Sequence, residues 1–320
     1  MRVLVTGGAG FLGSHLCDRL IADGHHVVSL DDYSSGRPEN LRQLEGNPRL
    51  HALRADVRHP IELAATPLDG LDRLYHLACP ASPTAYQRDP IGTARTAFQG
   101  TLEALELARR TGARFLLAST SEVYGDPEVH PQPETYLGHV NPIGPRACYD
   151  EGKRIAETLS FDFARQHGVD IRVARIFNTY GPRMADDGRV VMRFLASARR
   201  GEPLVVHGAG DQTRSFCFVS DMIEGLTALM EANEVQGPVN LGNDHEVTIL
   251  ELAQAIIQLL RSGQPIEHLP EREDDPSRRC PDMGVARRHL GWMPSVQLEE
   301  GLAHTLAWLE GRSPAGSNGQ

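Results

Sequence analysis

Tyr149 and Lys153 form the first pair of residues in this sequence whose types and spacing could do chemistry. They stand four positions apart in an amphipathic stretch, so a helix there places both side chains on one face. A tyrosine with its ordinary pKa of about 10 is a poor base at neutral pH. A neighbouring ammonium group, or any other positive charge close by, would lower that pKa. The pair therefore predicts a phenol that takes a proton from a substrate hydroxyl.

Lys153 is also the only lysine in the chain, because the other 31 of its 32 Lys and Arg residues are arginines. A compositional bias could have left one lysine anywhere in 320 positions, yet it falls one helical turn after Tyr149. A compact ammonium on a flexible stem suits a hydrogen bond to a ligand hydroxyl beside the tyrosine better than a planar guanidinium does. The alternative, a surface tyrosine and lysine on a helix, is therefore disfavoured.

A glycine-rich segment, Thr6–Gly13, joins the first predicted strand to the first predicted helix. Its glycines at 7, 10 and 13 follow a GxxGxxG spacing. Small residues let the backbone approach a pyrophosphate, and a helix N-terminus supplies N–H donors and a positive dipole. A glycine triplet alone could be a tight turn, but its place at the first strand–helix junction predicts a dinucleotide site.

Acidic residues follow the second and third predicted strands. The carboxylate of Asp31 can accept hydrogen bonds from both hydroxyls of the adenosine ribose and would repel a 2′-phosphate, which favours NAD over NADP. Arg37 argues the other way, because an arginine nearby can accommodate that phosphate. Asp56, followed by Val57, either faces the adenine or caps a helix over His59–Ala65.

A polar segment, Thr120-Ser121-Glu122, follows the fifth predicted strand. The carboxyl ends of parallel strands line the ligand crevice of such a sheet. Thr120 is therefore placed to hydrogen-bond the reacting hydroxyl beside Tyr149. Glu122 brings a carboxylate to the same strand end, and its alternative is a helix cap or an ion pair.

Short apolar runs alternate with helix-length amphipathic stretches through the first half of the chain. Strands are predicted over Arg2–Thr6, His26–Leu30, Leu50–Ala55, Arg73–Leu77, Arg114–Ser119 and Ile171–Ile176, and helices over Phe11–Asp23, Ile91–Thr111 and Tyr149–His167. This alternation predicts an α/β fold with a Rossmann-type, doubly wound parallel sheet. Nearly continuous apolar strands are expected where helices cover both faces.

The alternation breaks after Asn178, where Pro- and Gly-rich turns separate shorter elements. We expect a dinucleotide-binding domain over residues 1–178, to which part of 214–244 returns. A smaller substrate-binding lobe is expected over residues 179–312, with helices over Ile249–Leu260 and Leu298–Leu309. The polar tail, residues 313–320, is expected to be disordered.

Composition excludes several classes of protein. A net charge of −10 argues against nucleic acid as a partner. No apolar run approaches the roughly 18 residues of a membrane span, and the apolar start of the chain leaves no room for a signal peptide. Five cysteines without CxxC spacing argue against disulfides or a zinc knuckle. The sequence contains no HExxH pattern, so it gives no sign of a metal site of that kind. The expected compartment is the cytoplasm.

Taken together, the motifs resemble the extended short-chain dehydrogenases/reductases that act on nucleotide sugars, and more narrowly the UDP-glucuronate decarboxylases, or UDP-xylose synthases. The resemblance covers about residues 1–310. It is carried by Thr6–Gly13, Tyr75–Pro83, Leu117–Pro131, Asn141–Lys153, Ala174–Met184, Gln212–Arg214 and Asp274–Pro276. The glycine loop is shared by the whole superfamily, whereas residues 120–122 and 146–153 are more specific.

The resemblance implies which residues contact NAD and the UDP-sugar. For NAD they are Gly7, Gly10, Phe11, Leu12, Gly13, Asp31, Asp32, Ser35, Gly36, Asp56, Val57, Leu77, Cys79, Thr96, Tyr149 and Lys153. For the UDP-sugar they are Pro80, Tyr86, Glu122, Asn178, Val191, Gln212, Arg214, Asp275 and Arg279. The resemblance also implies a homodimer that pairs helices of the Rossmann domain.

Two residues favour decarboxylation within this superfamily, whose members first oxidise the C4 hydroxyl of the sugar. The related dehydratases use an Asp-Glu pair to expel the C6 hydroxyl, and this chain has Ser121 in place of that Asp. Arg279 matches the family arginine that holds the C6 carboxylate, and arginine can clamp a carboxylate through two parallel hydrogen bonds. The alternative for Arg279 is a phosphate contact or a surface position.

Two positions depart from the family pattern. Ala97 stands where the family usually has an asparagine that is thought to organise the site, and Gln99 or a water could compensate. Cys79 replaces a serine near the cofactor, which is a small change of shape and hydrogen bonding.

The sequence thus predicts NAD-dependent conversion of UDP-glucuronate to UDP-xylose and CO₂ through a UDP-4-keto intermediate, with NAD regenerated in place. Tyr149 would take the C4 hydroxyl proton, and Thr120 and Tyr149 would stabilise the enolate oxygen. Glu122 and Ser121 would manage substrate geometry and protonation at C5. The alternatives are a UDP-sugar 4-epimerase and a non-catalytic NAD-sensing regulator. Regulators of that kind commonly lose the tyrosine or the lysine, and this chain keeps both.

Overall fold

The structure is a computed structural model that describes residues 1–61, 70–271 and 278–311. Three expectations from the sequence fall wholly or partly outside these residues. They are the substrate contact of Asp275, the tail over 313–320, and the helix over 59–65. Residues 59–61 of that expected helix are described, and they are not helical.

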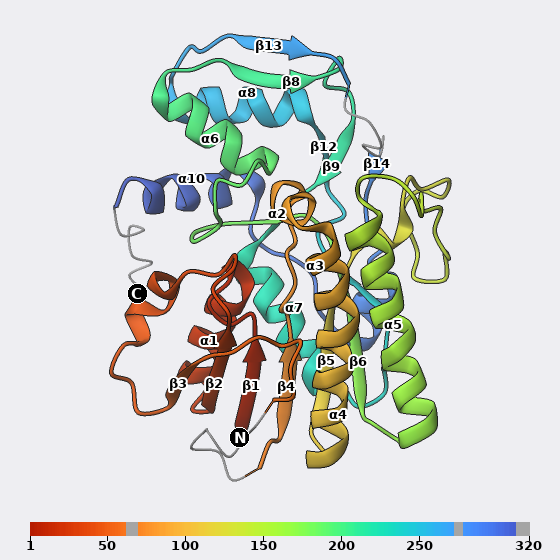
Figure 1. Cartoon of the computed structure of the whole chain (residues 1–320). Coiled ribbons are helices and arrows are strands. Elements are labelled where there is room, and N and C mark those ends of the chain that lie inside the picture. The colour runs from red at the N-terminus through yellow and green to blue at the C-terminus, as the bar shows by residue number, and fades with distance from the viewer. Residues whose placement is uncertain (62–69, 272–277, 312–320) are drawn as a thin grey trace.

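Seven parallel strands form one sheet, in the order β11-β6-β5-β4-β1-β2-β3. The strands are β1 (Arg2–Thr6), β2 (His26–Asp31), β3 (Leu50–Arg54), β4 (Arg73–His76), β5 (Arg114–Thr120), β6 (Ile171–Ile176) and β11 (Val239–Leu241), as Figure 1 shows. The six predicted strands are all present, and each end lies within one residue of its prediction. The predicted parallel α/β fold is therefore confirmed.

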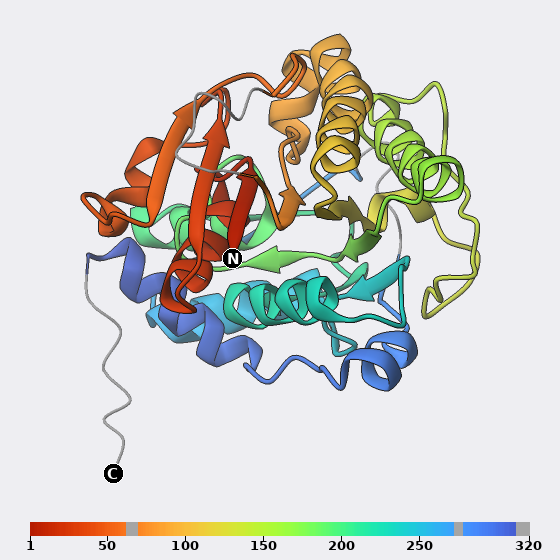
Figure 2. The same ribbon diagram turned by 90° about the horizontal axis from the view of Figure 1, so that it is seen from below.

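Apolar side chains cover both faces of this sheet, and β1 shows how. Leu4 packs on the face covered by α4 (Thr101–Thr111) and α5 (Ala147–His167). Its neighbours Val3 and Val5 pack on the opposite face, against α1 (Phe11–Ala22) and α7 (Val219–Glu231). Figure 2 shows helices on the two sides of the sheet. Burial on both faces explains why the strands read as nearly continuous apolar runs.

The predicted helix over Ile91–Thr111 is confirmed, since the whole range is helical, but it consists of three consecutive segments. They are α3 (Pro90–Arg95), a π-helical turn (Thr96–Gly100) and α4. The turn packs closely against α5, since a Cβ on Gly152 would come within 2.8 Å of Ala97 Cβ. Single π-helical turns often mark functional sites. This one begins at Thr96, which lines the cavity described below, and leads directly into α4.

The C-terminal lobe lies beyond the carboxyl ends of the sheet strands (Figure 1). Its strand pairs are β8 (Leu204–His207) with β13 (Ile266–Leu269), and β7 (Thr179–Tyr180) with β10 (Cys217–Phe218). A three-stranded sheet has the order β12 (Glu246–Thr248), β9 (Thr213–Ser215) and β14 (Arg278–Arg279). The remaining helices are α2 (Pro83–Arg88), α6 (Val190–Arg200), α8 (Ile249–Leu260), α9 (Gly284–Leu290) and α10 (Leu298–Leu309). The predicted bounds of α8 and α10 are confirmed.

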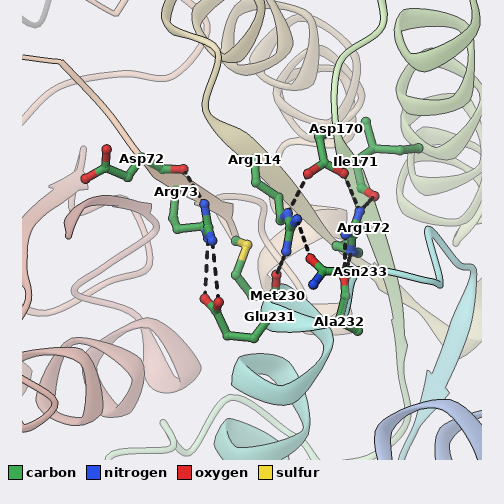
Figure 3. A network of polar contacts seen from close by, with 10 residues as sticks. All are labelled: Asp72, Arg73, Arg114, Asp170, Ile171, Arg172, Met230, Glu231, Ala232 and Asn233. Carbon is green, nitrogen blue, oxygen red and sulfur yellow. Dashed lines mark hydrogen bonds and ion pairs between the residues drawn. The ribbon is translucent and has the colours of Figure 1, made fainter.

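At the amino ends of β5 and β6, two arginines bind the end of α7 (Figure 3). Arg114 donates to the Met230 carbonyl at 2.8 Å, and Arg172 donates to the Ala232 carbonyl at 2.8 Å. Asp170 pairs with both arginines, at 2.6 and 2.5 Å. The last carbonyls of a helix have no partner within it. The arginines supply those partners and thereby attach α7 to the sheet.

Replacing Arg172 with methionine should lower the free energy of unfolding by about 1.5–3 kcal/mol, as for buried hydrogen bonds to a charged group. The side chain of Arg172 is 1% exposed, so the Ala232 carbonyl would be left without its donor. Urea unfolding followed by circular dichroism measures the change.

The matched control is Arg19→Met, which removes an exposed pair with Asp23 on α1. Exposed pairs of this spacing contribute about 0.5 kcal/mol or less. Equal losses in the two variants would show that the buried network adds nothing to stability.

Candidate active site

A cavity of about 1000 Å³ lies between the carboxyl ends of the sheet strands and the C-terminal lobe. The turns after β1, β2, β4 and β5 and the start of α5 line one side, and residues of α6, β9 and β14 line the other. Ligands of open α/β sheets bind at this edge, where the carboxyl ends of the strands meet.

The structure brings most of the predicted site residues together around this cavity. They are Gly7, Gly10, Phe11, Leu12, Gly13, Asp31, Asp32, Ser35, Val57, Leu77, Cys79, Pro80, Tyr86, Thr96, Thr120, Ser121, Glu122, Tyr149, Lys153, Asn178, Val191, Gln212, Arg214 and Arg279.

Two described residues of the predicted set do not line the cavity. Gly36 packs against Asp31, where a Cβ on the glycine would lie 2.6 Å from a carboxylate oxygen. Asp56 neither faces the cavity nor caps a helix, because its carboxylate pairs with the Arg58 guanidinium at 2.6 Å and accepts from the Arg58 amide at 2.9 Å. Asp275 lies outside the described residues.

The glycine loop fits a pyrophosphate because it has no room for side chains. Gly7 has φ +71°, and a Cβ there would lie 2.9 Å from the Ala78 amide nitrogen. A Cβ on Gly13 would lie 2.0 Å from the Gly7 carbonyl oxygen. No side chain caps α1, which begins at Phe11. The first-turn amides, which have no partners within the helix, can therefore bind an anion.

The carboxylate of Asp31 is held in place by backbone amides. One oxygen accepts from the Ala9 amide at 3.0 Å, and the other accepts from the Tyr33 amide at 2.8 Å. Each oxygen can accept a further bond, and the residue lines the cavity. Burial raises the pKa of this carboxyl. Arg37 lines the cavity as well, with an exposed side chain.

Lys153 is buried between α5 and β5. Its Nζ donates to the Ala118 carbonyl at 2.9 Å and lies 5.9 Å from the centre of the Tyr149 ring. An ammonium has three donors, so the bond to Ala118 leaves others for a ligand in the cavity. These contacts fit a lysine that orients a nicotinamide ribose beside Tyr149.

Tyr149 is buried and stacks on Tyr86, with ring centres 5.3 Å apart and planes 4° apart. Burial raises its pKa well above 10, and a hydrogen bond with Thr120 acts in the opposite direction. The sequence suggested that Lys153 would lower this pKa. In the protein alone the cost of burying a phenolate outweighs such effects.

A short 3₁₀ helix, Ser121–Tyr124, turns the chain at the end of β5. Thr120 caps it by accepting from the Glu122 amide at 3.3 Å, and its hydroxyl also forms a hydrogen bond with Tyr149. The turn leaves the Thr120 and Ser121 side chains buried at the cavity wall. It also directs Glu122 toward residues of the C-terminal lobe.

Glu122 accepts from two arginines. Arg279 donates to its two oxygens at 2.6 and 2.9 Å, and Arg146 donates to it at 2.5 Å. Burial alone would raise the pKa of Glu122, but the two guanidinium groups lower it to about 2. The guanidinium fork that the sequence assigned to a substrate carboxylate is therefore bonded to a carboxylate of the protein.

Sequence reasoning missed Arg146 and Asp150 as site residues. Arg146 lines the cavity, and Asp150 lies behind it, 6% exposed, with its Oδ1 lacking a hydrogen-bond partner. Burial, followed by the charge of Glu122, raises the pKa of Asp150 to about 7. Helical spacing was the available signal, because 146 and 150 are one turn apart on α5. That spacing could not show that the Glu122 carboxylate lies next to Arg146 in the fold.

The lobe side of the cavity is more basic than the sequence suggested. Arg183, Arg189 and Arg193 line it together with Gln212 and Arg214. Arg189 pairs with Asp187 at 2.8 Å, and Arg183 pairs with Asp18 of α1. Such residues suit the diphosphate and base of a nucleotide sugar.

The two departures from the family pattern are both placed. Ala97 is buried against Gly152, and its carbonyl accepts from the Thr101 hydroxyl at 2.7 Å. Gln99 is exposed and does not line the cavity. Cys79 lines the cavity, and burial raises the pKa of its thiol despite the nearby Lys153.

Neither a membrane-spanning helix nor a metal-binding cluster is present in the part of the chain that the structure describes. None of its helices has the length and apolar character needed to cross a membrane. None of its side chains form a group of three or more His, Cys, Asp or Glu that could hold a metal ion.

Comparison with known proteins adds independent findings. The model of the NAD dependent epimerase/dehydratase family matches residues 3–242. The chain is 55% identical to UDP-glucuronic acid decarboxylase 3 of Arabidopsis thaliana over 304 residues, which cover 94% of this chain and 87% of that one. It is also 55% identical to UDP-glucuronic acid decarboxylase 1 of Xenopus tropicalis, over 95% of this chain and 71% of that one.

Among solved structures, the fold is similar to UDP-glucuronic acid 4-epimerase from Bacillus cereus in complex with UDP-glucuronic acid and NAD. The TM-score is 0.88 at 28% identity, over 97% of this chain and 99% of that one.

Proposed function

This chain belongs to the NAD dependent epimerase/dehydratase family, and we propose that within it the protein decarboxylates UDP-glucuronic acid to UDP-xylose and CO₂. The observation that carries this proposal is the guanidinium fork of Arg279, buried near Tyr149 at the cavity wall and already bonded to a carboxylate. A sugar with a neutral C6 group offers nothing for such a fork, whereas a C6 carboxylate does. The two relatives that are 55% identical to this chain over the aligned residues are named for the same activity.

The cofactor is NAD, which the glycine loop, Asp31 and Lys153 would hold, and it would supply a reversible hydride acceptor for C4 of the sugar. Tyr149 takes the proton of the C4 hydroxyl, and the Thr120 hydroxyl donates to the same oxygen. Lys153 holds the ribose while its bond to Ala118 fixes its position.

The 4-keto sugar is a β-keto acid, so the electron pair of the C5–C6 bond can move toward the C4 oxygen as CO₂ leaves. Tyr149 and Thr120 donate to that oxygen as its negative charge develops. Arg279 holds the C6 carboxylate in the position that Glu122 occupies in the structure. Arg146 retains Glu122 and keeps it ionised, so Glu122 acts as an acceptor that, with Ser121, orients a water as the proton donor to C5, and not as the acid itself.

The uridine diphosphate is held on the lobe side of the cavity. We assign this contact to Asn178, Val191, Gln212 and Arg214, which all line that side. Arg189 and Arg193 add positive charge for the two phosphates.

We also propose that the protein is a homodimer, paired through helices of the Rossmann domain. Apolar side chains are exposed on α3, on the π-helical turn and on α5: Ile91 (69%), Phe98 (44%) and Ile155 (38%). Light scattering during size-exclusion chromatography tests this, and a monomer mass would refute it. Because all five cysteines are unpaired, a reducing compartment such as the cytoplasm suits the protein.

Incubation with UDP-glucuronate and NAD tests the function directly. NMR of the sugar product should show UDP-xylose, with one CO₂ released per turnover and no accumulation of free NADH. UDP-galacturonate without CO₂ would instead show an epimerase. No change of the sugar, with NAD bound, would show a regulator.

Arg279→Ala should lower kcat/KM for UDP-glucuronate by roughly 30-fold to several thousandfold, as for truncation of one partner in a desolvated charge pair. The affinity for UDP, which has no sugar carboxylate, should change little in calorimetry. The matched control is Arg278→Ala, an exposed neighbour on the same strand, β14. Equal losses of UDP affinity and turnover would make Arg279 a phosphate ligand or a structural residue.

Lys153→Arg should lower kcat by at least about 100-fold, within the range that general acid–base groups contribute. The positive charge is kept, but the larger planar guanidinium has to fit a buried site in which the Lys153 ammonium donates to the Ala118 carbonyl. Arg165→Lys, an exchange on the exposed surface of α5, is the control. A kcat near that of the wild type would show that the single lysine is a compositional accident.

A further inference from the structure

Asp150 is a buried carboxyl that the reaction as proposed above does not use. It follows Tyr149 on α5, is 6% exposed and does not line the cavity. Its Oδ1 is buried and lacks a hydrogen-bond partner. A buried carboxylate oxygen without a donor is costly, whereas a protonated carboxyl tolerates such a site more easily. The position therefore suits a carboxyl that holds a proton.

The groups that face Asp150 come from several elements. Glu122 follows β5, Arg279 is on β14, Tyr86 is on α2, and Arg146 and Glu151 are on α5 itself; the charges of all five interact with Asp150. The three guanidinium hydrogen bonds that Arg146 and Arg279 make to Glu122 satisfy that carboxylate and not Asp150. The Tyr86 hydroxyl is likewise buried without a partner.

We propose that Asp150 is the proton-holding residue of this carboxylate site and takes up a proton when the carboxylate of the UDP-sugar binds. The inference rests on the proposed function, because it requires a substrate with a carboxylate near Arg279. Asp150 is thus a positioning residue. It contacts neither the sugar nor the cofactor, and its proton sets the net charge of the carboxylate site that binds the sugar.

Electrostatics selects Asp150 over Glu122 for that proton. A third carboxylate beside the two of the protein raises the pKa of each, because like charges oppose ionisation. In the structure the guanidinium groups lower the pKa of Glu122, whereas burial and the charge of Glu122 raise the pKa of Asp150. When the substrate carboxylate replaces Glu122 on Arg279, Glu122 keeps its bond from Arg146, whereas the Asp150 Oδ1 has no donor, so Asp150 takes the proton.

The proton balance of the reaction agrees with this inference. The carboxylate leaves as neutral CO₂, and the electron pair that joined C6 to C5 ends in a C5–H bond. One turnover therefore consumes one proton. A proton taken up with the substrate brings that proton into the site before the bond breaks.

Calorimetry in two buffers of different ionisation enthalpy counts the protons bound with a ligand. The holoenzyme would carry Tyr149→Phe, so that UDP-glucuronate binds without turnover. At pH 8 we expect UDP-glucuronate to bind with uptake of about 0.5–1 proton, and UDP-xylose with close to none. Adding Asp150→Asn should abolish the uptake while UDP-xylose still binds, which shows an intact site.

Glu151→Gln is the matched control, since it removes the neighbouring carboxylate on the same helix and should keep the uptake. Uptake that persists in Asp150→Asn would overturn the inference and place the proton elsewhere. In the active enzyme, KM for UDP-glucuronate should rise with pH above about 7 in the wild type and stay flat in Asp150→Asn. A parallel pH profile with uniformly lower kcat would show a merely structural role and would also overturn it.

These outcomes separate the inference from the proposed function. A protein that fails to bind UDP-glucuronate, or binds it without forming UDP-xylose in the wild type, contradicts the function. Binding and turnover without proton uptake at Asp150 contradict only the inference.

Discussion

The arrangement of the site depends on the buried ion pair of Glu122 with Arg279, because it joins the end of β5 to β14 of the C-terminal lobe. Taking both charges out of water is costly, so such pairs add little to stability on balance. The bidentate geometry and the second guanidinium, from Arg146, offset part of that cost. A pair that is satisfied in this way is better explained by the chemistry of the site than by stability. It maintains a binding position for a carboxylate, and that position is already formed and free of water before a ligand arrives.

A second set of contacts sets the distance between α5 and β5, and with it the position of Tyr149 relative to Thr120. The bond from Lys153 to Ala118 is followed one turn later by a bond of 2.6 Å from Ser119 to Glu157. Arg175 on β6 donates to the same glutamate at 2.9 and 2.7 Å. Gly152 lets the helix approach the π-helical turn. The reacting groups therefore lie on two rigid elements, as precise positioning requires.

Much of the fold could be read from the sequence because a parallel sheet covered on both faces leaves continuous apolar strands, as β1 and β5 do. The glycine loop, Tyr149 and Lys153 were equally readable, since their spacing is local. The partners of Glu122 were not, because Arg146 and Arg279 lie 24 and 157 positions away and only the fold brings them together. The π-helical turn was missed because helical periodicity hardly changes across one wide turn. The raised pKa of Tyr149 was missed because burial has no local sequence signal.

Selection of an acidic sugar follows from the same ion pair. A neutral C6 group that separated Arg279 from Glu122 would leave a buried charge without its partner, at a cost of about 3–5 kcal/mol, or roughly 150- to 5000-fold in affinity. A carboxylate that takes the place of Glu122 keeps the Arg279 guanidinium paired, while Arg146 keeps its bond to Glu122. Neutral sugars are thus penalised as well as acidic ones attracted, and specificity commonly needs both. Under the function proposed above, the specificity determinant is the exchange of one carboxylate for another on Arg279, with Arg146 retaining the displaced Glu122.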